Sequence, residues 1–195
     1  MKNIHGLLLA GCSALALSGC GPSDIASPGT GGDVIINNPT PTPTGTPTGG
    51  AGGTVTAAAG CPTIADPQGL KDEGTISGPE GTWRVCSLPA RINTSVTLQK
   101  VPGLLYQLPG RVDVGTDRGA VATTGEASVT LTIQPGVIVF GGTGVSWLHV
   151  NRGNKINAAG TATQPIIFTS RDNVLGLNGE NSSGQWGGIV LSGRA

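Results

Sequence analysis

Apolar residues in the second half of the chain alternate with small polar residues in short runs. The runs cover residues 129–133, 137–140, 147–150, 166–168 and 189–191, and most of them are followed by a Gly or a pair of Gly residues. None of them has the spacing of an amphipathic helix. The pattern therefore predicts short β-strands separated by tight turns.

Two of these runs align as an internal repeat. The segment Leu131-Thr-Ile133-Gln-Pro-Gly136 matches Leu148-His-Val150-Asn-Arg-Gly153, 17 positions later, and Val139 then falls on Ile156. A spacing of about 17 to 20 residues suits one coil of two or three short strands. We expect each strand to pair in parallel with its equivalent in the next coil, so that inward apolar residues stack in columns.

Three segments resemble motifs of bacterial exported proteins of the right-handed parallel β-helix type. They are Leu131-Thr-Ile-Gln-Pro-Gly-Val137, Gly160-Thr161 followed by Pro165-Ile-Ile-Phe-Thr-Ser170, and Gly184-Gln-Trp-Gly-Gly-Ile189. The resemblance covers residues 129–195. It implies an all-β fold, a right-handed parallel β-helix or solenoid, and relatives that look like surface lipoproteins and adhesin-like proteins.

Residues 61–128 contain apolar runs broken by Pro89, Pro102 and Pro109. We interpret this segment as an N-terminal β cap, because the first coil of a β-helix otherwise exposes apolar columns and unpaired strand edges. No closing coil follows residue 191 in the sequence. We therefore expect a truncated, incomplete β-helix at 129–195, the alternatives being end-to-end oligomers or a domain of marginal stability.

The N-terminus predicts export and lipidation. Lys2 precedes a nearly uncharged run at 4–17, which is too short to span a bilayer as a permanent helix. The run ends in Leu17-Ser-Gly-Cys20, which resembles the bacterial lipobox. This implies a signal peptide at 1–19, lipid on Cys20 and contact with the membrane through the lipid anchor. Gly21, where an Asp would indicate inner-membrane retention, favours the outer membrane, on its periplasmic or surface face.

Two alternatives to this lipobox stay open. Cys12 ends a similar motif but leaves a shorter apolar run before it, and Cys20 could be a spare thiol after an ordinary signal peptide.

Residues 20–60 are rich in Gly, Pro and Thr, so they cannot bury enough apolar surface to offset the entropy of ordering. We predict a disordered linker there.

Cysteine usage agrees with export. Cys61 and Cys86 are the pair that remains outside the signal and the lipobox. In an oxidising compartment such a pair is expected to form a disulfide. A metal site is the weaker alternative, because no His lies near either thiol in the sequence.

The charge balance and the candidate catalytic residues limit the classes of function that the sequence allows. The 11 basic and 11 acidic residues balance, so a nucleic-acid partner is not expected. His149 alternates with Leu148 and Val150, which predicts an outward, solvated side chain. As a general base it would need a carboxylate partner and a cleft.

Four acids are candidates for a lyase or glycosidase but are scattered singly along the chain: Asp113, Asp117, Asp172 and Glu180. Residues 172–185 contain oxygen ligands of the kind found in a calcium loop, but without its spacing, and they fit an insertion between coils. The sequence thus assigns no catalytic residue, metal or cofactor.

Two functions remain. The first is a non-enzymatic, lipid-anchored cell-envelope protein whose β-helix is a scaffold for adhesion or for binding a surface polysaccharide or protein ligand. The alternative is a lipid-anchored carbohydrate-active enzyme, a polysaccharide lyase or glycosidase, with its active site on further coils.

Overall fold

The computed structural model describes residues 54–194, and the predicted signal peptide, Cys20 and most of the linker lie outside them. The first half of the described chain forms β1 (Lys71–Gly78), β2 (Gly81–Ser87), β3 (Arg91–Ile92), β4 (Val96–Leu98), β5 (Leu104–Leu108) and β6 (Arg111–Val114). The second half forms β7 (Thr130–Ile133), β8 (Ile138–Gly141), β9 (Trp147–Val150), β10 (Lys155–Asn157), β11 (Ile167–Ser170), α1 (Arg171–Val174) and β12 (Ile189–Leu191). Among these residues no helix has the length and apolar character needed to cross a membrane.

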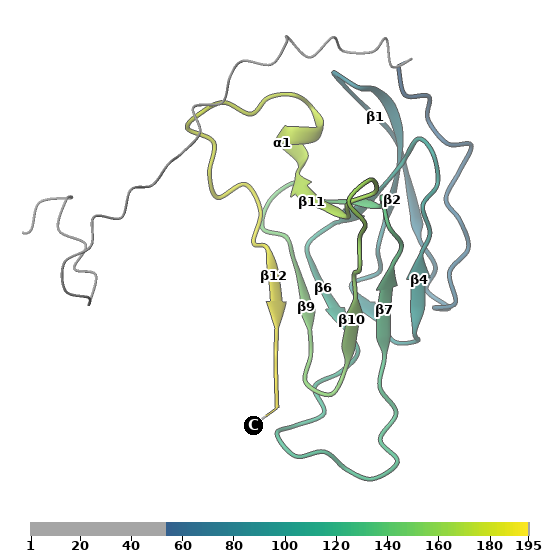
Figure 1. Cartoon of the computed structure of the whole chain (residues 1–195), viewed down its shortest axis with the longest axis vertical. Helices are drawn as coiled ribbons and strands as arrows, with labels where there is room; N and C mark the ends of the chain where they lie inside the picture. Colours follow the sequence, from purple (N-terminus) through teal and green to yellow (C-terminus); the bar gives the residue numbers. More distant parts are fainter. Residues whose placement is uncertain (1–53, 195) are drawn as a thin grey trace, which may run out of the picture. The chain divides into compact units, whose positions relative to one another are not determined.

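The strands form three sheets, and successive strands pass from one sheet to the next. Sheet A has the order β1-β2-β5-β8-β11, sheet B the order β12-β9-β6-β3, and sheet C the order β10-β7-β4. All pairs are parallel except the hairpin of β1 and β2. From β2 onward, each strand pairs with the third strand before or after it, as can be followed for β12, β9 and β6 in Figure 1. The predicted all-β architecture with parallel strands is confirmed.

The pairing corrects the predicted repeat. Leu131 on β7 lies beside Val96 and Ile156, whereas Leu148 on β9 lies beside Val112 and Ile189. The segments aligned at 17 residues therefore belong to two different sheets, and that spacing is wrong as a coil length. Stacked partners are 20 positions apart at Arg84 and Leu104, and 41 apart at Leu148 and Ile189.

The 17-residue alignment instead matched two copies of the same local backbone feature, a strand followed by a glycine turn. In both segments a strand with two inward side chains is followed by a corner at a glycine with positive φ, 78° at Gly136 and 79° at Gly153. Glycine reaches this backbone conformation without the steric cost of a Cβ atom. The same strand-and-corner unit occurs after β7 in sheet C and after β9 in sheet B, which explains why the sequence looked periodic.

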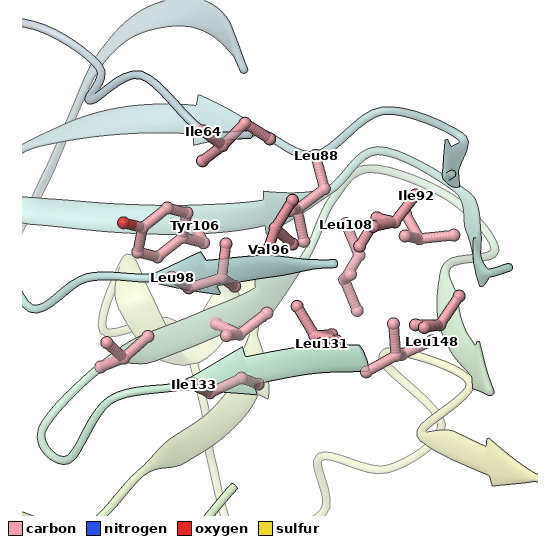
Figure 2. Packing of buried hydrophobic residues seen from close by; sticks show 14 of the residues in the cluster. Ile64, Leu88, Ile92, Val96, Leu98, Tyr106, Leu108, Leu131, Ile133 and Leu148 are labelled. Carbon is pink, nitrogen blue, oxygen red and sulfur yellow. The ribbon is translucent and has the colours of Figure 1, made fainter. Parts of the chain in front are cut away.

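Inward side chains stack in register and form the core. The larger buried cluster contains the aligned sets Val96–Leu131, Val112–Leu148 and Cys86–Tyr106–Val139, which come from sheets C, B and A respectively. The partly buried Ile156, which pairs with Leu131, packs against this cluster. Figure 2 shows several of these side chains filling the space between the strands. The predicted apolar columns are thus present, with the register of the longer coil.

A smaller cluster lies on the other face of sheet A. Val85, Leu105 and Phe140 are buried there under Trp83 and Val174. The central strands β2, β5 and β8 of sheet A are therefore apolar on both faces, as is usual for parallel strands that are covered on each side. This arrangement leaves sheets B and C as the faces with polar outward positions.

The parallel sheets extend across residue 128, where the sequence placed the boundary between cap and coils. β4 pairs with β7, and β6 pairs with β9. The segment before β1 lies along the first strands: Val55 N–H donates to Glu80 at 2.7 Å, and Ala58 N–H donates to Gly103 at 3.0 Å.

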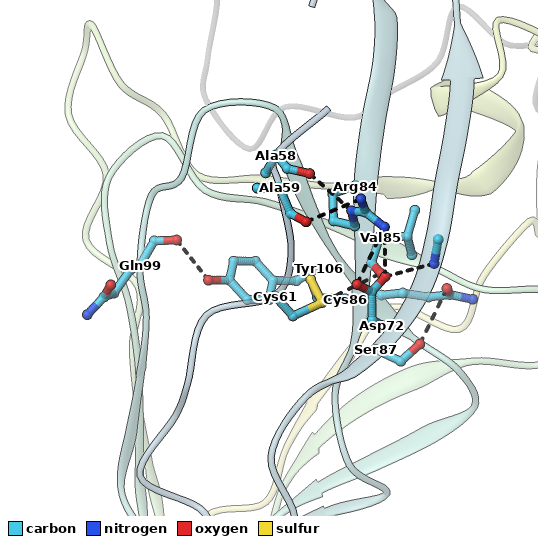
Figure 3. The surroundings of a disulfide bond; sticks show 12 residues. Ala58, Ala59, Cys61, Asp72, Arg84, Val85, Cys86, Ser87, Gln99 and Tyr106 are labelled. Atoms are coloured by element: carbon cyan, nitrogen blue, oxygen red, sulfur yellow. Dashed lines mark hydrogen bonds and ion pairs between the residues drawn. A yellow bond between two sulfur atoms is a disulfide. The ribbon is translucent and has the colours of Figure 1, made fainter. Parts of the chain in front are cut away.

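A disulfide joins Cys61 to Cys86, as the sequence indicated, and Figure 3 shows its surroundings. Cys86 on β2 is fully buried, so the bond fastens the segment before β1 directly to the core. Beside it, the hydroxyl of Tyr106 donates to the carbonyl of Gln99 at 2.8 Å, and burial raises the pKa of Tyr106 to about 12.

Asp66 makes a second attachment of the same segment. Its carboxylate accepts hydrogen bonds from the backbone N–H groups of Gln68, Asn93 and Thr94 at 3.0, 2.6 and 3.1 Å. Burial alone raises the pKa of Asp66, but these backbone hydrogen bonds outweigh it and hold the pKa below its ordinary value. The charged carboxylate therefore holds the corner between β3 and β4.

Candidate functional site

The outward face of sheet B carries a group of hydrogen-bonded polar and charged side chains with catalytic or binding potential. Alternation along β6 and β9 directs Val112 and Leu148 into the core and places Asp113 and His149 on the opposite face. Pairing then puts Arg91, Asp113, His149 and Val190 side by side on four neighbouring strands. We call the following set the sheet B cluster: Arg91, Arg111, Asp113, His149, Asn151 and Ser192.

Asp113 is the centre of the cluster. Its Oδ1 atom accepts hydrogen bonds from Arg111 Nε at 3.0 Å, from Arg111 Nη2 at 2.9 Å and from Asn151 Nδ2 at 3.1 Å. On the other side, Arg91 Nη2 lies 3.7 Å from Oδ2. Only 8% of the Asp113 side chain is exposed.

The environment keeps this carboxylate charged. Burial by itself raises the pKa of Asp113, but the hydrogen bonds from Arg111, Asn151 and His149 outweigh it, so the pKa lies below its ordinary value. Asp113 is consequently an anion throughout the neutral pH range. It can accept hydrogen bonds and stabilise a neighbouring cation.

His149 is held between a carboxylate and a hydroxyl. Its Nδ1 atom lies 3.0 Å from Asp113 Oδ1, and its Nε2 atom lies 2.9 Å from Ser192 Oγ. The predicted outward direction is correct, but the expected solvation is wrong, since only 17% of the side chain is exposed. The reason is the register of β6 and β9, which brings Asp113 opposite His149 from 36 positions away.

Two arginines border the cluster and reach into solvent. Arg91 and Arg111 each have half of the side chain exposed. With Asp113, Gln68 and Asn93 they line a shallow hollow in the surface. The guanidinium of Arg111 also lies 6.0 Å from the ring centre of Trp147, a cation–π distance.

The other candidate acids lie elsewhere. Asp117 forms a two-point ion pair with Arg152, which lowers the pKa of Asp117 to about 2. Asp172 is in α1 and accepts a hydrogen bond from Gln185 at 3.0 Å, and Glu180 is exposed in the loop that follows. Within residues 54–194, no three His, Cys, Asp or Glu side chains are grouped so that they could hold a metal ion.

Most residues of the sheet B cluster were missed by the sequence analysis. Asp113 and His149 were considered separately, whereas Arg91, Arg111, Asn151 and Ser192 were not considered as site residues at all. The signal that could have found them is the outward position within each apolar run. These outward positions can be matched between strands only when the runs are aligned with spacings between paired residues that vary from 20 to 41 positions.

One comparison with known proteins gave a match. Residues 116–195 match the family model of a pectate-lyase-like β-helix domain. Comparison with curated proteins and with solved structures gave no match. The family match covers less than half of the chain, and together with the parallel strand order it supports a parallel β-helix.

Proposed function

We propose that this protein is a lipid-anchored component of the cell envelope whose right-handed parallel β-helix binds an acidic polysaccharide on the outward face of sheet B. The observation that carries the proposal is the pair of half-exposed arginines, Arg91 and Arg111, beside a surface hollow. The match of residues 116–195 to a pectate-lyase-like β-helix domain supports a carbohydrate as the ligand.

The charges of the hollow favour an anion. Two guanidinium groups share a single buried carboxylate, Asp113, so one positive charge remains unpaired when His149 is neutral. A guanidinium can donate two parallel hydrogen bonds to a carboxylate, and a half-exposed Arg retains free donors for this purpose. The carboxylates of a uronic acid polymer fit this requirement.

Side chains around the hollow can make the hydrogen bonds and apolar contacts that a sugar needs in addition to ionic contacts. The side chains of Gln68 and Asn93 line the hollow with amide donors and acceptors. Trp147 lies beside Arg111 and is only partly buried, so its indole offers an apolar surface. Successive parallel strands repeat every ~4.8 Å, so the four strands of sheet B give a regular face along which part of an extended polymer can lie.

Anchoring rests on the sequence. The lipobox-like segment ending at Cys20 and the Gly- and Pro-rich linker after it support a β-helix tethered to the outer membrane. Several acyl chains on one Cys would hold the protein far more firmly than one chain, since each buried methylene contributes about 0.8 kcal/mol. Adhesion to surface polysaccharide would then occur at the distal end of the linker.

Binding of polygalacturonate by the full-length protein in detergent tests the proposal. Isothermal titration calorimetry should show binding to polygalacturonate and none to dextran, a neutral polymer. Arg91→Gln should weaken the affinity about tenfold, because one hydrogen bond to a charged group is lost. Arg152→Gln removes a partly exposed, ion-paired Arg outside the hollow and is the matched control, with unchanged affinity. Equal binding of dextran, or an unchanged affinity of Arg91→Gln, would refute the proposal.

A further inference from the structure

A carboxylate, an imidazole and a hydroxyl are joined by hydrogen bonds across β6, β9 and the residue that follows β12. Asp113 is on β6, His149 is on β9, and Ser192 directly follows β12. The two contacts that join them are 3.0 Å, from Asp113 Oδ1 to His149 Nδ1, and 2.9 Å, from His149 Nε2 to Ser192 Oγ. None of these contacts is needed to explain the binding of a polysaccharide at Arg91 and Arg111.

We propose that Ser192, His149 and Asp113 form a serine acyl-hydrolase site that cleaves short acyl esters. The esters would be substituents of the polysaccharide of the proposed function, so the identity of the substrate rests on that proposal. The hydrolytic chemistry does not depend on it. Such a site has the three parts that nucleophilic catalysis requires: a nucleophile, a base within hydrogen-bond reach and a group that orients the base.

The hydrogen bonds select the tautomer that the reaction needs. Asp113 is a charged acceptor, so the proton of His149 lies on Nδ1 and is donated to Oδ1. The lone pair of Nε2 then faces Ser192 and accepts its hydroxyl proton. Arg111 Nη2 also lies 3.2 Å from Nδ1, but it donates to Asp113 at the shorter distance of 2.9 Å.

The scaffold holds each member in place. Asn151 donates from one Nδ2 group both to Asp113 at 3.1 Å and to the carbonyl of Gly115 at 2.9 Å, which fixes the carboxylate. Ser192 is fixed at its backbone, where its N–H donates to the carbonyl of Val150 at 3.0 Å. Asp113 and His149 lie on paired strands and are therefore positioned more rigidly than residues of a free loop.

The reaction proceeds in two balanced halves. Ser192 Oγ attacks the ester carbonyl carbon while its proton moves to His149 Nε2. The bond from that carbon to the alkoxy oxygen then breaks, and the sugar hydroxyl leaves with the proton from Nε2. Water next attacks the acyl-serine and gives a proton to Nε2. The carboxylic acid departs as Ser192 Oγ takes the proton back, so ester and water become acid and alcohol. Asp113 stabilises the imidazolium in both halves.

The test uses the full-length protein in detergent with two small probes, p-nitrophenyl acetate and an alkyl fluorophosphonate. Wild type should hydrolyse the ester and acquire one phosphonyl adduct, which peptide mass spectrometry should place on Ser192. Ser192→Ala and His149→Ala should lower the hydrolysis rate at least about a thousandfold. Asp113→Asn should lower it on the order of a thousandfold or more, because it favours the wrong tautomer. Ser183→Ala, an exposed loop serine, is the matched control and should retain the full rate.

Other results would overturn the proposal: no adduct, an adduct on another serine, or full hydrolysis by Ser192→Ala. Ser192 lies outside the core, and circular dichroism of Ser192→Ala matching that of wild type separates lost chemistry from lost folding. A protein that binds polygalacturonate but leaves both probes untouched refutes the hydrolase site alone. A protein that reacts with the probes but does not bind the polymer refutes only the proposed function.

Discussion

Replacing Asp113 with Asn should destabilise the protein by about 2 kcal/mol at pH 7. The substitution preserves the shape of the side chain and removes its charge. Hydrogen bonds to a charged group contribute about 1.5–3 kcal/mol each and neutral ones about 0.5–1.5, so each converted bond loses about 1 kcal/mol. The hydrogen bonds from Asn151 and His149 are largely shielded from water, so each should lose the full amount. The hydrogen bonds from the half-exposed Arg111 should lose little, because its guanidinium group regains contact with water.

The loss should depend on pH in a defined direction. The pKa of Asp113 in the folded protein lies below its ordinary value of about 3.9. The charged carboxylate therefore stabilises the fold above that ordinary value, and this contribution disappears as the pH falls through the lowered folded pKa. The difference in unfolding free energy between wild type and Asp113→Asn should be present at pH 7 and shrink near pH 3.

Urea unfolding followed by tryptophan fluorescence measures this difference as a shift of the midpoint at unchanged slope. Asp117→Asn is a suitable control, because its carboxylate is exposed and its ion pair with Arg152 is accessible to water; its effect should be clearly smaller. Equal stability of Asp113→Asn and wild type at pH 7 would contradict the central position assigned to Asp113. So would a difference that stays the same at pH 3.

Three further changes test other parts of the molecule. Removing the disulfide by Cys61→Ala with Cys86→Ala frees a segment with a separation of 25 residues and should cost about 3 kcal/mol; dithiothreitol should lower the urea midpoint of wild type but not of this variant. Asp66→Ala leaves three backbone N–H groups without their acceptor and should cost about 3 kcal/mol, with faster hydrogen exchange at these amides. Cys20→Ser should abolish incorporation of radiolabelled palmitate, and label that persists in this variant would exclude Cys20 as the lipidated residue.

The strands of the second half of the chain could be predicted closely. The run at 147–150 coincides with β9, and the run at 189–191 with β12. Between them, β10 (Lys155–Asn157) was missed as an apolar run, because Ile156 alone provides its inward contact. A strand this short is stabilised by its parallel neighbour β7 and has too few apolar residues to stand out in the sequence.

The coil length could not be predicted because it is not constant. The segments between β6 and β7 and between β11 and β12 are long, while most corners are short. Regularity resides in the pairing of the strands, and the connections vary freely at the surface. A search for a fixed period therefore aligned the strand-and-corner units at Gly136 and Gly153 in place of stacked strands.

The prolines of the first half were misleading for a related reason. Pro89, Pro102 and Pro109 lie between strands, at the corners that separate β2 from β3, β4 from β5, and β5 from β6. At a corner the missing N–H removes no ladder hydrogen bond. These residues separate regular parallel strands, whereas the sequence analysis interpreted the segment that they interrupt as an N-terminal β cap.

The sheet B cluster escaped the sequence analysis because its members meet across coils and not along a strand. The candidate acids were considered singly along the chain, whereas the pair that formed is Asp113 and His149, on different strands. Val112 and Leu148 stack in the core from the same two strands, so core packing fixes the register that sets this contact. A shift of β6 by one residue would turn Asp113 into the core and Val112 toward His149. The hydrophobic residues that stabilise the fold therefore also set the geometry of the site. An insertion within β6 should for this reason disrupt the contact between Asp113 and His149.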